Sequence, residues 1–407
     1  MRYGLLGRKL GHSYSPLIHK YFGNEDYDLF EIEPESLANF MQVSSFKGIN
    51  VTIPYKKEVI AYCDSISTVA QQLGAVNTII RKQDNTLWGH NTDYFGFQYM
   101  LKKSGLSVKN KKVLVLGSGG ASVTVKAVLE DHGAKAIVIS RSGTDNYSNL
   151  DTHLDAAIIV NATPVGMHPN NGLSPIDINM FPALEGVLDL IYNPHRTKLI
   201  LDAQKRGLVA LNGLWMLVAQ AYEAAKLFTD QSIDEDKIIS IYDKINKQTQ
   251  NRIFIGMPGS GKSTLGKLYA EATGRKFVDA DTKIEEYAQL SIPEIFSQYG
   301  EERFRQIESE VLKELGKCSG LVIATGGGCV TRPENYAPLH QNGIIIWIRR
   351  NVHDLPTNGR PLSQKADLTK MYESRKPLYA QFSDWCIDND SDISQALQQI
   401  MKLEERI

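Results

Sequence analysis

One eight-residue stretch constrains the fold of this chain more than any other. Residues 256–263 read GMPGSGKS and match G-x-x-x-x-G-K-[ST] at every fixed position. An apolar run at 253–255 precedes the motif and a helix-like run at 265–272 follows it, the strand–loop–helix context that the motif requires. Its glycines let backbone N–H groups surround phosphate oxygens, while Lys262 would reach the outer phosphates and Ser263 would hold Mg²⁺. The predicted nucleotide contacts are Gly259, Ser260, Gly261, Lys262, Ser263 and Thr264.

A second glycine turn follows an apolar run in the first half of the chain. Residues 111–122 read KKVLVLGSGGAS, which again predicts a strand, a glycine loop and a helix. The chain therefore restarts near residue 250, where a helical pattern at 234–246 gives way to the polar stretch KQTQN at 247–251. We interpret this stretch as a linker and expect the halves to fold and work independently when the chain is cut there.

Composition limits the classes of protein to which the chain can belong. Its 407 residues suggest two or three domains, and 42% hydrophobic with 22% charged residues is typical of a globular protein. The net charge of -1 gives no general attraction to nucleic acid or to an anionic membrane. Four cysteines without a CxxC pair suit a reducing compartment, and no apolar run approaches a membrane span. Because the first residues also lack a signal-peptide pattern, we expect a cytoplasmic protein.

Further residues with chemical roles follow the phosphate motif. FVDAD ends a strand with Asp279 and Asp281, of which one can serve the metal and the other can accept a hydroxyl proton. FRQIE places Arg305 and Glu308 on one helical face. LVIATGGG ends in three glycines, where backbone can approach a ligand closely. NGRPL and ESRKPLY then each contain an arginine, and such a set in fixed order favours a site over scattered surface residues.

In this order the elements form the pattern of a known family. The C-terminal half resembles shikimate kinase over its whole length, with a phosphate loop, D-x-D, F-R-x-x-E, G-G-G, an R-P-L lid and a final R-x-P-L-Y. The resemblance implies Mg-ATP as phosphate donor, with Asp279 near the metal, Asp281 and Lys262 in catalysis, and Arg360 closing over ATP from the lid. Phe296 and Phe304 would wall the pocket. The implied shikimate contacts are Asp281, Arg305, Gly326, Gly327, Gly328 and Arg375, the last arginine and Arg305 gripping its carboxylate.

The first half carries the parts of a hydride-transfer site. Its glycine turn opens a strand–helix–strand unit, as a dinucleotide fold requires. The next strand ends Ser-Arg-Ser, and Arg141 could pair with a 2′-phosphate, which favours NADP over NAD. Reduction of a ketone also needs a proton donor, and INVTIPYKKE presents Lys56 and Lys57, while GHNTDYFG supplies Asp93.

These segments together also form a family pattern. The first half resembles shikimate dehydrogenase across roughly residues 1–245, through S-x-S-P, N-V-T-x-P-x-K, G-A-V-N-T, N-T-D, the glycine turn, N-A-T-P-x-G-M and M-L-V-A-Q-A. The resemblance implies Lys56, rather than Lys57, as the catalytic acid/base, paired with Asp93. The implied substrate contacts are Ser13, Ser15, Thr52, Asn77, Asp93, Tyr192 and Gln220. The implied NADP contacts are Gly117, Ser118, Gly119, Gly120, Ala121, Arg141, Leu190, Gly213 and Met216.

The two resemblances imply an α/β architecture with three compact parts. We expect a two-lobed dehydrogenase at 1–248, with a substrate lobe at about 1–100 plus 213–248 and a Rossmann-like NADP lobe at about 101–212. A P-loop α/β domain of the nucleoside-monophosphate-kinase type would follow at 249–407.

The implied function is a bifunctional enzyme of the shikimate pathway, which leads to chorismate and the aromatic amino acids. One half would reduce 3-dehydroshikimate with NADPH, and the other would phosphorylate shikimate with Mg-ATP. Two alternatives remain at this stage: one half is a decayed domain kept for assembly, or the P-loop half is a nucleotide-binding regulatory module. Quinate also remains open as a substrate, and the sequence leaves the oligomeric state undetermined.

Overall fold

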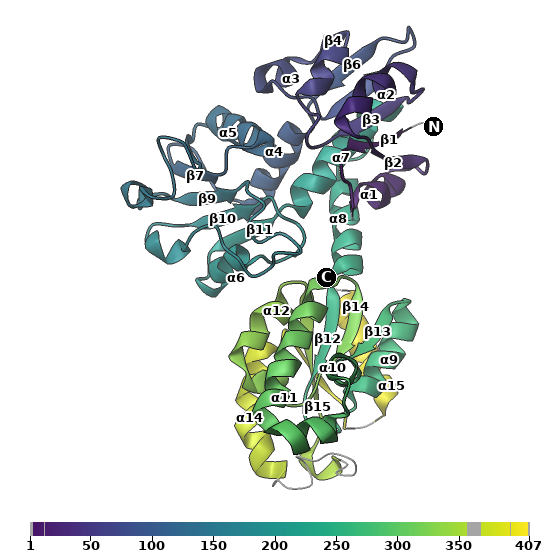
Figure 1. Ribbon diagram of the computed structural model, residues 1–407, viewed down its shortest axis with the longest axis vertical. Helices are drawn as coiled ribbons and strands as arrows, with labels where there is room; N and C mark the ends of the chain where they lie inside the picture. The colour runs from purple at the N-terminus through teal and green to yellow at the C-terminus, as the bar shows by residue number, and fades with distance from the viewer. Residues whose placement is uncertain (1–2, 12, 356–367, 391, 406–407) are drawn as a thin grey trace. The chain divides into compact units, whose positions relative to one another are not determined.

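The chain forms two compact units. The structure, a computed structural model, describes residues 3–11, 13–355, 368–390 and 392–405. The N-terminal unit contains Met1–Gly166, Leu173–Tyr192 and Leu199–Ile245. The C-terminal unit contains Asn246–Ile407 together with Met167–Gly172 and Asn193–Lys198. Figure 1 colours both units along the chain.

The N-terminal unit begins with a six-stranded mixed sheet. The strand order is β2-β1-β3-β5-β6-β4, with β5 antiparallel to both of its neighbours. The strands are β1 (Tyr3–Gly7), β2 (Tyr27–Glu31), β3 (Gly48–Val51), β4 (Ser65–Ile66), β5 (Thr78–Arg81) and β6 (Leu87–His90). The helices around it are α1 (Ser15–Tyr21), α2 (Leu37–Val43) and α3 (Thr68–Leu73). The parallel strands β1 and β3 bring the segments that follow them to one edge of the sheet.

A second sheet of the N-terminal unit is wholly parallel. Its order is β11-β10-β9-β7-β8, so the strand order reverses between β7 and β9, where ligands bind in doubly wound folds. The strands are β7 (Lys112–Leu116), β8 (Lys135–Ile139), β9 (Ile158–Asn161), β10 (Gly186–Asp189) and β11 (Val209–Asn212). Between β8 and β9 the chain has only the 3-10 helix Leu150–His153 in place of a full crossover helix.

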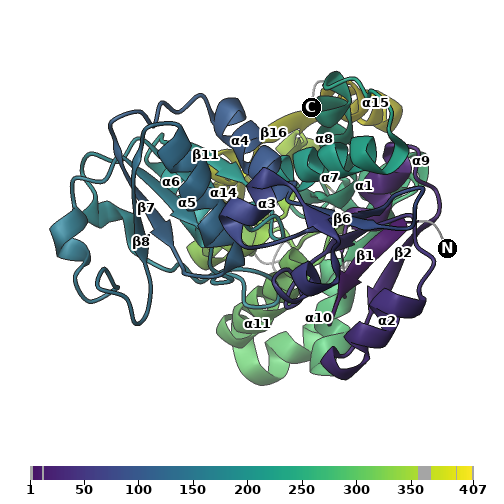
Figure 2. The same cartoon turned by 90° about the horizontal axis from the view of Figure 1, so that it is seen from above.

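Both faces of this parallel sheet are buried. Val113 and Val115 of β7 pack against the core formed with α5 (Gly120–Asp131), whereas Leu114 and Leu116 pack against the opposite core formed with α6 (Lys198–Lys205). Burial on both faces explains why its strands read as continuous apolar runs rather than alternating ones. Figure 2 shows α5 lying over β7 and β8.

Two longer helices and most of a third complete the N-terminal unit. α4 (Asp93–Ser104) packs against α7 (Leu214–Thr229) at close range, because Gly96 leaves room for the carbonyl of Met216. α8 (Asp236–Thr249) continues through most of the stretch that we interpreted as a linker. Only Gln250 separates α8 from the next strand, and Thr249 and Gln250 are both buried.

The C-terminal unit is a five-stranded parallel sheet between two layers of helices (Figure 1). The order is β13-β14-β12-β15-β16. The strands are β12 (Asn251–Ile255), β13 (Lys276–Asp279), β14 (Leu321–Ala324), β15 (Gly343–Arg349) and β16 (Trp385–Asp388). The helices are α9 (Lys262–Thr273), α10 (Ala280–Ala288), α11 (Ile292–Lys317), α12 (Tyr336–His340), α14 (Leu368–Phe382) and α15 (Ile393–Glu404). Central β12 therefore delivers its glycine loop to the middle of the sheet edge.

A buried ion pair ties the start of the C-terminal sheet to its last helix. Arg252 of β12 is fully buried, and its guanidinium donates to both carboxylate oxygens of Glu404 in α15. Tyr269 also donates to this carboxylate, at 2.9 Å. Burial would raise the pKa of Glu404, but hydrogen bonds from Arg252 and its positive charge hold that pKa below the usual range. No described helix in either unit is long and apolar enough to cross a membrane.

Candidate functional site

An ammonium–carboxylate pair lies in the first lobe of the N-terminal unit. Lys56 Nζ is 2.6 Å from Asp93 Oδ2, and the side chains are 22% and 12% exposed. Lys56 lies in the turn after β3, and its carbonyl accepts a hydrogen bond from Val76 N. Asp93 is the first residue of α4, where the helix N-terminus favours a negative charge. Lys57, the adjacent candidate, is exposed. The pair predicted from the sequence is therefore formed, with its amine accessible to a ligand.

Hydrogen bonds through Thr92 join two predicted residues, Asn77 and Gln220, beside this pair. Asn77 Oδ1 accepts from Thr92 N at 2.7 Å, and Asn77 Nδ2 donates to Thr92 Oγ1 at 3.1 Å. Thr92 also reaches Gln220 Oε1 of α7 at 3.4 Å. All three residues are buried, and Thr92 directly precedes Asp93. Sequence reasoning named Asn77, Asp93 and Gln220 but missed Thr92, which its place in the N-T-D motif could have suggested.

The other predicted substrate residues come from three further segments. Ser13 and Ser15 lie where β1 leads into α1, and Ser15 N donates to Ser13 Oγ at 3.2 Å. Thr52 directly follows β3, beside β1, and its amide donates to Leu6 O. Tyr192 follows β10 and packs its ring against Tyr14, with centroids 5.3 Å apart. Burial, with Tyr14 nearby, raises the pKa of Tyr192, so its phenol stays a neutral hydrogen-bond donor.

The glycine turn after β7 has the shape that a dinucleotide needs. Gly117 adopts φ 99, and a Cβ there would press on Thr163 and the carbonyl of Ala162. Gly119 caps α5 and Gly120 begins it, with open space where their side chains would lie. Ser118 is exposed and Ala121 is half-buried in the first turn of the helix. The turn thus presents a helix N-terminus to an approaching pyrophosphate.

Three of the implied NADP contacts, Leu190, Gly213 and Met216, lie near the start of α7. Gly213 is buried, and a Cβ on it would overlap the carbonyl of Leu190, so that only glycine fits. Gly213 N also donates to Ile191 O at 3.0 Å. Met216 lies one turn along α7 and is nearly buried. The structure therefore places these residues together, at the carboxyl end of β10.

Exposure and hydrogen bonding differ between the residue that follows β8 and the residues that end β9 and β10. Arg141, two residues after β8, is exposed and available to a phosphate group. Asn161 and Asp189 end β9 and β10, are fully buried, and are joined by a 3.0 Å hydrogen bond. Asn161 Oδ1 also accepts from Thr163, and Asp189 Oδ1 from Ile191 N. Sequence reasoning missed Asp189, whose isolated acid within an apolar strand was the available signal.

The phosphate loop of the C-terminal unit is formed as its motif predicts. Lys262 is buried, and its Nζ donates to the carbonyls of Gly256 and Met257, at 2.9 Å each. Ser263 Oγ donates to Asp279 Oδ2 at 2.7 Å. A hydroxyl and a carboxylate that meet beside a P-loop are the usual protein ligands of nucleotide-bound Mg²⁺. No cluster of three or more His, Cys, Asp or Glu residues that could hold a metal occurs in the described part of the chain.

A charged cluster lies beside the loop. Asp281 follows Asp279 in the first turn of α10, and burial, with the neighbouring charge of Asp279, raises its pKa. Arg305 Nη1 is 2.7 Å from Glu308 Oε2, and both side chains are buried. Burial raises the pKa of Glu308 despite the nearby Arg305. A Cβ on Gly326 would meet Glu308 Oε1 and Asp281 Oδ1, so the glycine lets the two acids approach its backbone.

A pocket of about 530 Å³ collects most of the predicted kinase residues. Arg375 of α14 lines it and donates to Gly327 O at 3.2 Å, while the rings of Phe296 and Phe304 pack at a tilt of 32°, with centroids 4.7 Å apart. Asp279 and Ser260 are not in the lining, although Asp279 bonds Ser263. The lining residues are Pro258, Gly259, Gly261, Lys262, Ser263, Thr264, Asp281, Glu285, Ile292, Pro293, Phe296, Phe304, Arg305, Glu308, Thr325, Gly326, Gly327, Gly328, Arg350 and Arg375.

Three charged residues of the pocket were not among the predicted contacts, and one predicted residue lies outside the described residues. Glu308 is the acid of F-R-x-x-E, so its i, i+3 spacing from Arg305 was the signal. Arg350 and Glu285 carried no signal stronger than a surface charge. Arg360, predicted to close over ATP, lies outside the described residues.

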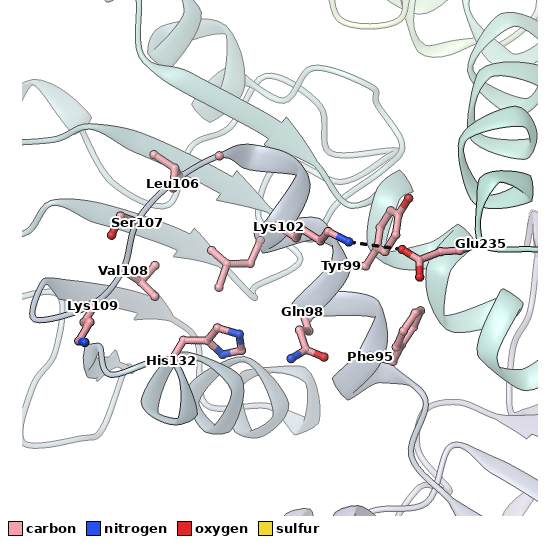
Figure 3. Close-up of a pocket in the computed structure, with 12 residues that line it drawn as sticks. Phe95, Gln98, Tyr99, Lys102, Leu106, Ser107, Val108, Lys109, His132 and Glu235 are labelled. Carbon is pink, nitrogen blue, oxygen red and sulfur yellow. Dashed lines mark ion pairs between the residues drawn. The ribbon is translucent and has the colours of Figure 1, made fainter.

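A second pocket, of about 620 Å³, lies along α4 of the N-terminal unit (Figure 3). It is lined by the far end of α4 and by the loop around Ser107, and Lys102 Nζ pairs with Glu235 at 3.5 Å across it. None of the predicted site residues lines it.

Comparisons with known proteins bear on the N-terminal unit first. A shikimate dehydrogenase (NADP(+)) of Clostridium beijerinckii is 35% identical over 260 residues, which are 59% of this chain and 96% of the relative. The chain belongs to the shikimate dehydrogenase family. Residues 5–79 also match the model of the shikimate dehydrogenase substrate binding domain.

Solved structures of this family agree with the fold. A chorismate mutase/shikimate 5-dehydrogenase fusion protein from Clostridium acetobutylicum is 40% identical, with a TM-score of 0.56 over 60% of this chain and 96% of that one. A shikimate 5-dehydrogenase from Thermus thermophilus, in complex with NADP(H) and shikimate, is 32% identical, with a TM-score of 0.54 over 60% and 99%.

The C-terminal unit matches a different family. Residues 258–404 match the shikimate kinase model, which covers the sequence from the phosphate loop to α15. The chain is therefore a fusion of a shikimate dehydrogenase with a shikimate kinase domain, as the two motif sets predicted.

Proposed function

We propose that this chain catalyses two successive reactions, the NADPH-dependent reduction of 3-dehydroshikimate and the phosphorylation of the shikimate formed. The observation that carries the proposal is that the described residues contain two separate candidate catalytic sets. One is the 2.6 Å pair of Lys56 and Asp93, and the other surrounds the pocket of about 530 Å³ at the phosphate loop. A decayed half would have no reason to keep such a set.

Lys56 is the proton donor of the reduction in this proposal. When bound, NADPH supplies the hydride, and the carbonyl oxygen of the substrate then needs a proton. The Lys56 side chain is partly exposed, and the 2.6 Å contact with Asp93 fixes its position. Asn77 and Gln220, tied together through Thr92, would orient the substrate hydroxyls.

The residues around the second sheet fit NADP. Gly213 leaves space that a Cβ would fill, and the glycines before α5 leave the helix N-terminus open to a pyrophosphate. Exposed Arg141 would pair with the 2′-phosphate, which an acidic residue at this position would repel.

Asp281 is the proton acceptor of the phosphorylation in this proposal. When bound, Mg-ATP supplies the phosphoryl group, and Lys262, Ser263 and Asp279 have the chemistry to hold its phosphates and metal. The raised pKa of Asp281 makes its carboxylate a better acceptor for a hydroxyl proton than an exposed aspartate. Arg305 and Arg375 would then bind the carboxylate of the acceptor.

This arrangement favours a kinase over a regulatory nucleotide site. A switch would need the phosphate loop, but it would have no use for buried Arg305 and Arg375 beside an acid in the same pocket. We therefore expect ATP consumption to depend on shikimate. Equal consumption with and without shikimate would contradict a kinase.

One coupled assay tests both reactions. The purified chain is given 3-dehydroshikimate, NADPH and Mg-ATP, and shikimate 3-phosphate is measured by mass spectrometry. We expect its formation to need all three reagents. Accumulation of shikimate without phosphorylation would remove the kinase, and no NADPH oxidation would remove the dehydrogenase. Replacing 3-dehydroshikimate by 3-dehydroquinate tests whether the related quinate couple is also accepted.

A further inference from the structure

The compact C-terminal unit contains two short segments from within the dehydrogenase sequence. Met167–Gly172 and Asn193–Lys198 belong to it, although the residues on either side of each segment belong to the N-terminal unit. The kinase family match begins only at residue 258. The kinase motifs do not include these segments. The contacts that the two segments make must therefore explain why they belong to the C-terminal unit.

Asn193–Lys198 is held by a set of hydrogen bonds around the start of β15. His195 N donates to Asn342 Oδ1 at 2.9 Å, and Arg196 N donates to Gln341 O at 2.8 Å. Arg196 Nη1 donates to the carbonyls of His340 and Gly343, at 2.8 and 3.0 Å. The segment thus satisfies carbonyls of the turn that joins α12 to β15.

A second group of contacts reaches the start of β12. The His195 ring nitrogen Nε2 lies 2.7 Å from Thr249 Oγ1, next to Gln250 and β12. Asn342, which accepts from His195, also accepts from Asn251 N through its own carbonyl at 2.7 Å. One asparagine therefore links the segment to both central strands of the sheet, at the end opposite the phosphate loop.

These contacts are buried. His195 is 3% exposed, Thr197 1% and Asn342 0%. Burial, with the nearby charges of Arg196 and Arg252, lowers the pKa of His195 to about 3, so its imidazole is neutral at physiological pH. A buried polar group destabilises a fold when it loses a partner, and Asn342 Oδ1 would lose the amide of His195 if the segment were removed.

The other segment, Met167–Gly172, is held by the same part of the C-terminal unit. His168 N donates to Asn193 O at 3.0 Å, which joins the two segments. Asn171 Nδ2 donates to Gln341 Oε1 at 2.9 Å. Gln341 therefore receives one hydrogen bond from each segment.

We infer that Asn193–Lys198 is an integral part of the folded C-terminal unit, seated on a surface formed by Thr249 and residues 340–343, and that it unfolds together with β12 and β15. The C-terminal unit is consequently incomplete in a fragment that begins at the boundary suggested by the sequence. The segment lies away from the phosphate loop, so it contributes stability rather than catalysis.

Hydrogen exchange of the full chain, read by mass spectrometry, tests the inference. Ile345→Val weakens the core of β15, and Ile159→Val is its matched control in β9, since both side chains are fully buried. An Ile→Val change shifts a folding equilibrium by roughly two- to tenfold. We expect Ile345→Val to accelerate exchange of residues 193–198 and β12 by the same factor, and Ile159→Val to leave both unchanged. No acceleration by Ile345→Val, or acceleration by Ile159→Val, would overturn the inference.

A second pair of variants tests the segment directly. Arg196→Ala removes a guanidinium that donates to two carbonyls of the C-terminal unit, and Arg206→Ala removes one that donates to the carbonyls of Ile178 and Phe181. We expect Arg196→Ala to accelerate exchange of β12 and β15 by about tenfold, with shikimate kinase kcat and KM within about twofold of the unmodified chain. Arg206→Ala should leave β12 and β15 unchanged. Unchanged exchange of β12 and β15 in Arg196→Ala would refute the inference.

Discussion

Lys56 and Asp93 show how much chemistry single residues reveal in this chain. Their motifs lie far apart in the sequence, and the resemblance paired them before the 2.6 Å contact was seen. The phosphate loop was equally readable, because all its residues are close in sequence. Asp189 and Thr92 were not predicted, because their roles depend on partners in other strands and helices. The reacting groups were therefore easier to predict from the sequence than the buried groups that support them.

Lys56→Ala should lower the rate of 3-dehydroshikimate reduction by ~10²–10⁴, because the carbonyl oxygen loses its proton donor. Shikimate phosphorylation should be unaffected. The measurement is NADPH oxidation at saturating substrate, with exposed Lys57→Ala as the matched control that keeps its activity. Full turnover in the Lys56 variant would show that another group donates the proton.

Arg141→Ala should raise KM for NADPH about tenfold or more and leave KM for NADH nearly unchanged, because a charge-assisted hydrogen bond to the 2′-phosphate is worth about 1.5–3 kcal/mol. The measurement is kcat/KM for both cofactors. Arg141→Lys, which keeps the charge, should retain part of the preference. If the unmodified enzyme uses the two cofactors equally well, Arg141 has no such role.

Asp281→Asn should abolish phosphorylation and yet increase the stability of the C-terminal unit at neutral pH. Burial raises the pKa of Asp281 above its ordinary 3.8, so the folded state binds this proton more tightly than the unfolded state does. The charged form of Asp281 therefore destabilises the fold. This destabilisation is fully present above the folded-state pKa and is absent at a pH well below 3.8. Urea unfolding at neutral pH should show the gain, and unfolding at a pH below 3.8 should not. A loss of stability at neutral pH would contradict the assignment.

The elements themselves were largely predictable from their patterns. The strand expected at 253–255 lies in β12, Asn251–Ile255, and the helix expected at 265–272 lies in α9, Lys262–Thr273. We interpreted the stretch at 247–251 as a linker because its residues are polar. Local polarity does not reveal which distant side chains contact a stretch of chain. Arg275 of the C-terminal unit donates to the carbonyls of Lys247 and Gln250, so these residues are held by a distant side chain.

Gly213→Ala should weaken NADPH binding, because the added methyl overlaps the carbonyl of Leu190 and forces the start of α7 away from β10. We expect KM for NADPH to rise while phosphorylation is unchanged. Gly207→Ala is the control, since that glycine has a positive φ but open space around it. Its variant should lose some stability but keep its affinity for NADPH, measured by fluorescence titration.

At the scale of the whole molecule, the fusion of two enzymes was predictable, whereas the course of the chain between the units was not. The P-loop and the glycine turn each predict an α/β fold, so the number of such folds could be predicted from the sequence. The place of Asn193–Lys198 in the C-terminal unit depends on contacts with residues 340–343, which no local pattern encodes.

Lys262→Ala should abolish phosphorylation and leave the reduction rate within about twofold. The two catalytic sets share no described residue, and distant sites without common partners usually act independently. The measurement is the rate of each half-reaction in the full chain, with Lys267→Ala, an exposed lysine of α9, as control. A large fall in reduction rate would show that the kinase site and the dehydrogenase site are energetically coupled.

The hydrogen bonds of Asn193–Lys198 also determine when this segment can reach its folded contacts during translation. The ribosome translates Asn193–Lys198, β11 and α7 before residues 340–343, which hold His195 and Arg196 in the folded chain. At ~5–20 residues per second this interval lasts roughly seven to thirty seconds. During it, this segment lacks its contacts with residues 340–343, and a chaperone or a protease can reach it. Release of the last residues of β15 from the exit tunnel closes that window.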